Sequence, residues 1–209
     1  MVDQARFFQL LVPFDVKLSA SQAAQALAYL DLLMRWNRKI NLTAIRSEEE
    51  CVTRHFGESF LLSRRFDLKG RLLDVGSGAG FPGLPLKIAF PALAVTLLEP
   101  VAKKRAFLKE VARVCQMVSV EVRGERLNDF ARSLHAPCYE TVTSRAVGKL
   151  DRLIPSAAEC LVPGGRLCLW LTADQTKTIS SISPGLSWGD PIPIPLAHES
   201  QIVVGTRVR

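Results

Sequence analysis

The residues best placed to do chemistry form a glycine-rich segment, Leu72 to Gly83, which reads LLDVGSGAGFPG. A short apolar run leads into Asp74, and glycines follow at positions 76, 78, 80 and 83. Glycine permits a tight turn between a strand and a helix, and it lets a ligand approach main-chain N–H groups closely. The segment therefore predicts a cofactor-binding turn at the end of a buried parallel strand.

A second acidic residue strengthens this interpretation. Val95 to Leu98 predicts another buried strand, and Glu99 follows it directly. In a nucleotide-binding βαβ unit, an acid at the tip of the second strand can accept hydrogen bonds from both ribose hydroxyls. We expect Glu99 to contact a ribose rather than to be an ordinary surface residue.

The spacing of the glycines separates two cofactor classes. Dinucleotide sites favour G-x-G-x-x-G, which places a pyrophosphate at a helix N-terminus. Here the order is Asp74-x-Gly76-x-Gly78-x-Gly80. It resembles the first motif of class I methyltransferases, in which the acid and the turn hold the amino-acid end of S-adenosylmethionine. An NAD(P)-binding Rossmann oxidoreductase is the alternative.

Helices are predicted from apolar spacing and end signals. Ser19 to Gln22 forms a candidate capping box, and apolar residues at helical spacing continue to about Arg38. Ser47 opens a second helix that runs to Phe66. A third begins at Lys103 and continues to Val114. These patterns predict an N-terminal helical extension over residues 1–66.

Further strands complete the expected sheet. Apolar runs predict strands over 118–122, 139–143 and 166–171, a turn over 161–165, and late antiparallel edge strands near 192–196 and 202–204. Strands and helices that alternate in this way indicate an α/β fold. We expect a class I (Rossmann-like) methyltransferase fold over 67–209, with a mostly parallel seven-stranded sheet flanked by helices.

Composition bounds the class of protein. The 209 residues carry a net charge of +7, which favours a phosphate-rich partner over a small neutral substrate. The five cysteines include no C-x-x-C pair, so we expect reduced thiols and no metal. No signal sequence and no apolar run of roughly 18 residues are present. We therefore expect a cytoplasmic protein that acts as a monomer, without a membrane partner.

Cationic side chains gather in several segments that could contact RNA phosphates or be solvated surface. The first turn of the helix at Lys103 is basic, against the preference set by the helix dipole, and such exceptions often mark ligand sites. The candidate RNA-binding residues are Arg35, Arg38, Lys39, Arg54, Lys103, Lys104 and Arg105.

Several short motifs together resemble the RsmG (GidB) family, the bacterial small-subunit rRNA guanine-N7 methyltransferases. The resemblance runs from about Leu27 to Leu169. It rests on Trp36-Asn37 with Ile40 to Ile45, Arg54-His55, Leu72 to Gly83, Gly124-x-Arg126, and Ser144-Arg145-Ala146. The resemblance implies S-adenosylmethionine as cofactor and one guanine in the decoding-region stem-loop of 16S rRNA as target. The implied cofactor contacts are Gly76, Phe81, Glu99, Leu127, Asn128 and Arg145.

The chain departs from the family pattern at four positions. The usual acid after Gly-x-Arg-x is Asn128, and the acid before Ser59 is Glu58, which has a longer side chain. A family Lys appears as Leu171, and a family Arg appears as Ser200. These changes concern substrate contacts. They leave open a methyltransferase of the same fold that acts on another RNA or on a small molecule, or an RNA-binding protein without activity.

The implied reaction requires no acid or base side chain. Guanine N7 has a free lone pair, so no base must remove a proton before it attacks the methyl group. Catalysis then depends on alignment and electrostatics. We assign no catalytic residue, and we expect Arg145 and His55 to position the RNA or the methionine carboxylate.

Overall fold

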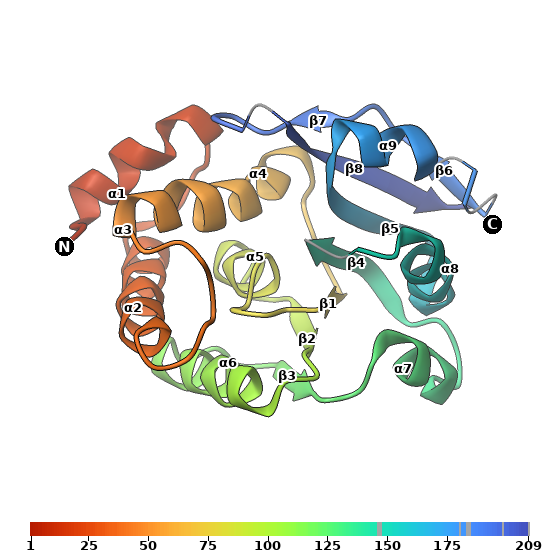
Figure 1. The fold of residues 1–209 in the computed structure, drawn as a ribbon, viewed down its shortest axis with the longest axis horizontal. Coiled ribbons are helices and arrows are strands. Elements are labelled where there is room, and N and C mark those ends of the chain that lie inside the picture. The colour runs from red at the N-terminus through yellow and green to blue at the C-terminus, as the bar shows by residue number, and fades with distance from the viewer. Residues whose placement is uncertain (146–147, 180, 183–184, 198, 209) are drawn as a thin grey trace.

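The computed structural model describes residues 1–145, 148–179, 181–182, 185–197 and 199–208, and these form a twisted sheet between two helical layers (Figure 1). The strand order is β3-β2-β1-β4-β5-β8-β6, and β7 pairs with β8. The predicted fold class is confirmed, with a short eighth strand within the described residues. The strands are β1 Arg71–Val75, β2 Ala94–Leu98, β3 Val120–Arg123, β4 Tyr139–Arg145, β5 Leu161–Thr172, β6 Leu186–Trp188, β7 Ile192–Pro193 and β8 Ser200–Arg207.

Parallel pairing aligns the strand ends that carry the predicted site. Val75 pairs with Leu98 on one side and with Ser144 on the other. The glycine turn after β1, Glu99 after β2 and Arg145 at the end of β4 therefore meet at one edge of the sheet. Ligands bind at this carboxyl edge in open α/β sheets.

Helices cover both faces of the sheet. Residues of α5 and α6 belong to one hydrophobic cluster, to which the N-terminal helices also contribute, whereas α7 and α8 belong to a second. Because residues before position 66 share a core with the sheet, the domain boundary there stays a prediction. The helices are α1 Gln4–Leu11, α2 Ala20–Asn37, α3 Glu48–Glu50, α4 Glu58–Arg65, α5 Gly83–Ala89, α6 Ala102–Val114, α7 Leu127–Ser133, α8 Leu150–Cys160 and α9 Ala173–Ile179.

The N-terminal helices follow their sequence signals closely. The capping box is present: the Ser19 hydroxyl accepts from the Gln22 N–H, and the Gln22 side chain accepts from the Ser19 N–H. The helix predicted after Ser47 contains a π-helical segment, Cys51–Gly57, between α3 and α4. Such a segment rotates the side chains that follow it relative to a regular α-helix, and it is frequent at functional sites.

Two predictions near the C-terminus are wrong. The turn expected over 161–165 lies within β5, where Leu161 pairs with Tyr139 and Arg166 pairs with Thr141. Both ends of this segment pair with β4, so the extra residues form a bulge that includes Gly164, whose φ is 77°. The edge strand expected to reach Leu196 ends at Pro193, and a turn follows it: the Ala197 N–H donates to the Ile194 carbonyl at 3.2 Å, and Leu196 has a φ of 64°.

Within the part of the chain that the structure describes, no helix is both long and apolar enough to span a bilayer.

Candidate active site

The glycine turn needs its glycines for two reasons. Gly76, Gly78 and Gly80 have φ values of 70°, 56° and 96°, which side chains disfavour. A Cβ at Gly80 would also lie 2.5 Å from the Tyr29 hydroxyl. That hydroxyl donates to the carbonyl of Ala79, so a side chain of helix α2 holds the glycine turn in place. The glycines permit the backbone conformation of the turn, and the contact with α2 stabilises it.

Glu99 ties the turn to the tip of β2. Its Oε2 accepts from the Gly78 N–H at 2.9 Å, and its Oε1 accepts from the Val101 N–H at 2.8 Å. The residue is only 4 % exposed. Each carboxylate oxygen keeps a lone pair after these bonds. The contact between Glu99 and a ribose stays a prediction. The hydrogen bond from Gly78 gives Glu99 a structural role as well, which the position of Glu99 in the sequence did not indicate.

Asp74 supports the turn from the interior. It is fully buried, and its Oδ1 accepts from the Thr143 hydroxyl at 2.8 Å. Its Oδ2 has no hydrogen-bond partner among the described residues. Burial raises the pKa of Asp74 to about 6, against the opposing effect of the Thr143 hydrogen bond. The predicted contact between Asp74 and a cofactor stays a prediction, because the side chain has no exposed surface in this structure.

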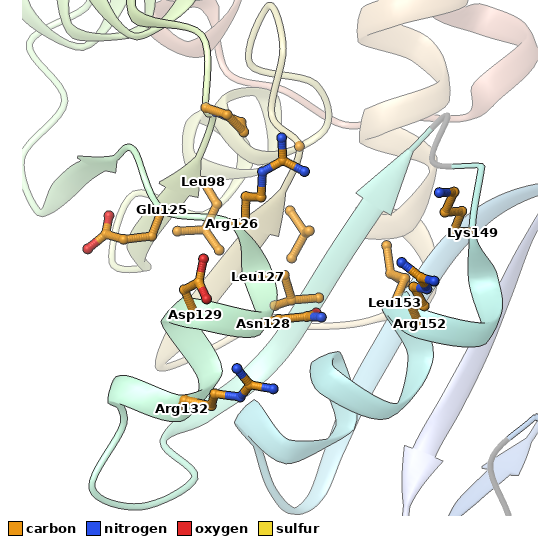
Figure 2. Close-up of a pocket in the computed structure, with 13 residues that line it drawn as sticks. Leu98, Glu125, Arg126, Leu127, Asn128, Asp129, Arg132, Lys149, Arg152 and Leu153 are labelled. Carbon is orange, nitrogen blue, oxygen red and sulfur yellow. The ribbon is translucent and has the colours of Figure 1, made fainter.

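A pocket of about 470 Å³ opens beside the turn, between α7 and α8 (Figure 2). Three predicted cofactor contacts line it: Gly76, Leu127 and Asn128. The Asn128 side chain accepts from the Ser156 hydroxyl at 3.0 Å and so links the two helices. Gly78, Gly80, Phe81 and Glu99 lie outside this lining. The apolar part of the wall consists of Val75, Leu98, Pro100, Leu127 and Leu153.

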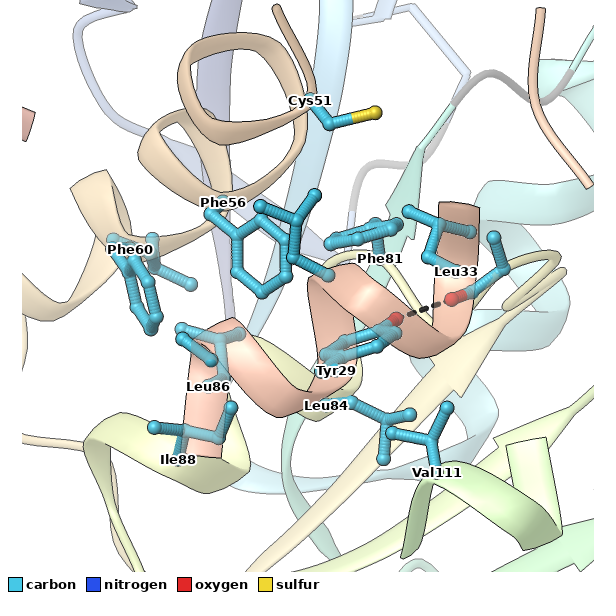
Figure 3. Close-up of a cluster of buried hydrophobic side chains, with 14 of the residues drawn as sticks. Tyr29, Leu33, Cys51, Phe56, Phe60, Phe81, Leu84, Leu86, Ile88 and Val111 are labelled. Atoms are coloured by element: carbon cyan, nitrogen blue, oxygen red, sulfur yellow. Dashed lines mark hydrogen bonds between the residues drawn. The ribbon is translucent and has the colours of Figure 1, made fainter. Parts of the chain in front are cut away.

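The Phe81 ring stacks on Tyr29 (Figure 3) and, on its other side, on His55. Its ring centroid is 5.2 Å from that of Tyr29 and 4.6 Å from that of His55, with nearly parallel planes. Phe81 is 7 % exposed. Its predicted cofactor contact stays a prediction, and in this structure the ring packs the N-terminal helices against the turn.

Arg145 is held by a carboxylate that it shares with Arg54. The Arg145 Nη2 lies 3.0 Å from Glu58 Oε2, and the Arg54 Nε lies 3.2 Å from Glu58 Oε1. The Glu58 side chain is 4 % exposed, and the Trp170 indole donates to its backbone carbonyl. Burial raises the pKa of Glu58, although the two guanidinium groups oppose that rise. The Arg145 Nη1 is buried without a partner in the described residues.

His55 joins this cluster as a neutral side chain. Its Nε2 lies 2.8 Å from the Thr43 hydroxyl, and its Nδ1 is buried without a partner among the described residues. Burial lowers the pKa of His55 to about 3, helped by the charges of Arg145 and Arg54. We call Arg54, His55, Glu58 and Arg145 the buried cluster, in which Arg54 is the exposed member, with 50 % of its side chain exposed. Sequence reasoning missed the role of Glu58, whose only local signal is its position four residues after Arg54.

The loop after α2 brings Thr43 to His55. The Asn37 side chain accepts from the N–H groups of Leu42 and Thr43, and it donates to the carbonyls of Thr43 and Ile45. Asn37 is 4 % exposed. The Trp36-Asn37 motif therefore has a structural role, because Asn37 closes the loop that positions the partner of His55.

The predicted RNA-binding cations fall into two groups. Arg35 pairs with Asp31 at 2.8 Å, Arg54 pairs with Glu58, and Arg105 donates to the carbonyls of Glu99 and Pro100. These three side chains already bind groups within the protein. The structure gives no ion pair between a described residue and the remaining four: Arg38, Lys39, Lys103 and Lys104. Arg35 and Lys39 also line a groove between α2 and α6 of about 630 Å³.

Two departures from the family pattern meet in the sheet. Leu171 pairs with Gln201, and the neighbouring Thr172 pairs with Ser200. Leu171 is buried in the core. The positions at which the family pattern has a Lys and an Arg are therefore cross-strand neighbours, just beyond Trp170, the partner of Arg145. Ala146, the last residue of the Ser144-Arg145-Ala146 motif, lies outside the described residues.

Neither the cysteines nor the other potential metal-binding side chains form a further site among the described residues. All five cysteines are free. Burial raises the pKa of Cys168 to about 12, which keeps its thiol protonated and unreactive. Among the residues that the structure describes, no group of three His, Cys, Asp or Glu side chains could hold a metal ion.

Comparison with solved structures places the fold. A TrmN from Thermus thermophilus superimposes with a TM-score of 0.61 at 17% identity, over 75% of this chain and 53% of that one. A ribosomal protein L11 methylase from Lactobacillus delbrueckii subsp. bulgaricus gives a TM-score of 0.61 at 14% identity, over 75% and 79%. At these identities the likeness shows the fold alone.

Comparison with sequences places the family. Residues 22–180 match the family GidB, described as rRNA small subunit methyltransferase G. A ribosomal RNA small subunit methyltransferase G from Chloroflexus aggregans is 39% identical over 204 residues, which cover 93% of this chain and 86% of that protein. One from Xylella fastidiosa is 40% identical over 81% of this chain and 78% of its own. The chain belongs to the rRNA small subunit methyltransferase G family.

Proposed function

We propose that this protein is an S-adenosylmethionine-dependent methyltransferase that modifies N7 of one guanine in the decoding-region stem-loop of 16S rRNA. The observation that carries the proposal is the pocket beside the glycine turn, at the carboxyl edge of the sheet, in a chain that belongs to this family. The proposed partner is small-subunit rRNA. We also propose that the enzyme is cytoplasmic and acts as a monomer.

The residues around the turn fit the proposed cofactor. The apolar side chains of the pocket suit a flat adenine, and the exposed backbone of Gly76 leaves room for a close approach. Glu99 offers acceptor oxygens for a ribose, and Asn128 offers an amide at the pocket wall. S-adenosylmethionine, when bound, supplies a methyl group on a positively charged sulfur. No pyrophosphate is present in it, which agrees with the spacing of the glycines.

The buried cluster supports a reaction without acid–base chemistry. Guanine N7 needs no proton removed, and His55, with its pKa lowered to about 3, stays neutral at physiological pH. Positive charge moves from sulfur to the base during transfer, so cations next to the base disfavour the transfer. Glu58 offsets one of the two guanidinium charges of Arg54 and Arg145. We assign Arg145 and His55 to positioning, which they perform from inside the protein, because the Arg145 Nη1 and the His55 Nδ1 are both buried.

The target guanine must be accessible at N7. This atom lies on the major-groove edge, and the major groove of A-form RNA is deep and narrow. We therefore expect the enzyme to act on a guanine that is unpaired or turned out of its helix.

The test compares cofactors and acceptors. A ligand that binds only the folded state raises the melting temperature. S-adenosylmethionine should raise it and NAD should not, whereas protection by NAD would support an oxidoreductase. Labelled methyl groups should then appear in small-subunit RNA and become soluble after ribonuclease digestion. Incorporation into small molecules without RNA would contradict the proposed substrate, and no incorporation despite cofactor binding would contradict the activity.

A further inference from the structure

Four cationic side chains surround the pocket between α7 and α8. They are Arg126, Arg132, Lys149 and Arg152, and all four are exposed. No ion pair joins any of them to another residue in the described ranges. Their neighbour Arg123 differs, because its guanidinium pairs with both Glu121 and Glu125. We call these four side chains the α7–α8 rim.

The rim brings together residues from two helices. Arg132 comes from α7, whereas Lys149 and Arg152 come from the start of α8 (Figure 2). Two acids also line the pocket, but Glu125 pairs with Arg123, a guanidinium that it shares with Glu121 and that lowers the pKa of Glu125 to about 2. Asp129 is the remaining carboxylate. The pocket mouth therefore carries an excess of positive charge.

The proposed cofactor does not explain this charge. S-adenosylmethionine has a sulfonium, an ammonium and one carboxylate, so it is a net cation at neutral pH. Its adenine and ribose, which suit the apolar part of the pocket, carry no charge. Four cations would repel rather than attract such a ligand. Their anion must come from elsewhere.

We propose that the α7–α8 rim binds phosphates of the RNA strand whose guanine is methylated. This inference rests on the proposed function. α8 follows β4, the strand that ends in Arg145, so the rim begins a few residues beyond the proposed position of the base. In this arrangement the RNA strand runs from the carboxyl end of β4, across the start of α8, to α7. Long exposed cations without partners bind phosphate with no internal pair to break.

The groove between α2 and α6 is less suited to this task. Its Arg35 and Arg113 pair with Asp31 and Glu110 at 2.8 and 2.7 Å. A phosphate that binds either arginine must displace a carboxylate, and Lys39 is the one lining cation of the groove that has no ion pair with a described residue. The RNA backbone next to the target therefore gains more from the rim than from the groove.

The test is charge reversal on the two helices, with Arg132→Glu and Arg152→Glu combined. We expect small-subunit RNA to bind about tenfold more weakly, and the salt dependence of binding to fall by roughly one for each side chain. Affinity for S-adenosylmethionine should not fall, since the reversal removes positive charge that repels this net cation. Combined Arg132→Lys and Arg152→Lys should keep most of the RNA affinity, because phosphate contacts require charge more than shape.

The matched control combines Lys17→Glu and Lys69→Glu. Both lysines are exposed. Lys69 precedes β1 at the opposite edge of the sheet and pairs with the exposed Asp67 at 2.8 Å, so Lys17 is the member of this control that has no ion pair with a described residue. The change in net charge is the same, so any loss common to both variants reflects the overall field. RNA affinity equal to that of the control would overturn the proposal, and so would an equal loss of cofactor affinity. Failure of the wild-type protein to bind RNA would overturn the proposed function and this surface together.

Discussion

The buried cluster and the α7–α8 rim lie on either side of the end of β4 and use cations in opposite ways. In the buried cluster, Arg145 shares Glu58 with Arg54 and has a side-chain exposure of 16 %. In the rim, Arg132 and Arg152 are exposed and have no ion pair with a described residue. Burying a charge requires a partner, whereas an exposed charge stays available to a ligand. Pairing therefore indicates which cations position groups and which attract phosphate.

Removing the shared carboxylate should have the largest effect on stability. Glu58→Ala leaves Arg145 in a buried site without its counter-charge, so we expect a loss of about 3–5 kcal/mol in the free energy of unfolding. Urea denaturation measures it. The exposed pair of Arg35 and Asp31 provides the control, and Asp31→Ala should cost less than about 1 kcal/mol. Similar losses in both variants would show that burial does not distinguish the two kinds of pair.

A substitution in the turn should remove cofactor binding while leaving both cationic regions intact. Gly78→Asp adds a side chain at a φ of 56° and a carboxylate beside Glu99. We expect affinity for S-adenosylmethionine to fall by about a hundredfold or more, as measured by calorimetry. Gly164→Asp is the matched control, because Gly164 has a φ of 77° and open space around it. Retained binding in Gly78→Asp would refute the assignment of the site.

The neutral state of His55 predicts a pH dependence of stability. Its pKa is about 3 in the folded protein, against 6.5 for an exposed histidine, so the unfolded chain takes up the proton first as pH falls. Its stabilisation is therefore complete above pH 6.5 and is lost toward pH 3. Between about pH 7 and pH 5, the stability advantage over His55→Gln should shrink by about 2 kcal/mol. The comparison cancels the opposite titration of Asp74, and a constant advantage would mean that His55 is not held neutral.

The smallest effect should distinguish cations within the other basic region. Arg38→Glu should weaken RNA binding by about threefold, and Arg35→Glu should have less effect because Arg35 is already paired with Asp31. Filter binding at several salt concentrations measures both. Neither change should alter cofactor affinity. A larger loss in Arg35→Glu would contradict the use of pairing to sort these cations, and an equal loss of RNA and cofactor binding would indicate misfolding.

The sequence predicts the parts of this protein whose signals are local. The glycine turn, the strands on either side of it and the acid at the second strand tip are each specified by neighbouring residues, so their positions agree with the structure. The segment 161–165 shows the limit of such signals. Its Pro163-Gly164 pair predicts a turn, but pairing with β4 on both sides turns it into a bulge within β5.

The rest depends on contacts between distant segments. Nothing near Arg145 predicts that Glu58 holds it, and nothing near His55 predicts the burial that lowers its pKa to about 3. No spacing in the sequence predicts the α7–α8 rim, because the packing of α7 against α8 is what brings Arg132 and Arg152 to one pocket. Tertiary packing thus decides which cations bind within the protein and which face a ligand.

The most direct test of the central claim is transfer of labelled methyl from S-adenosylmethionine to small-subunit RNA, offered both naked and as the assembled subunit. Strand scission at N7-methylguanine maps the product. We predict a single cleavage site in the decoding-region stem-loop, and the better substrate form will date the step in assembly. Incorporation without scission would contradict N7 as the acceptor, and scission elsewhere would contradict the proposed target.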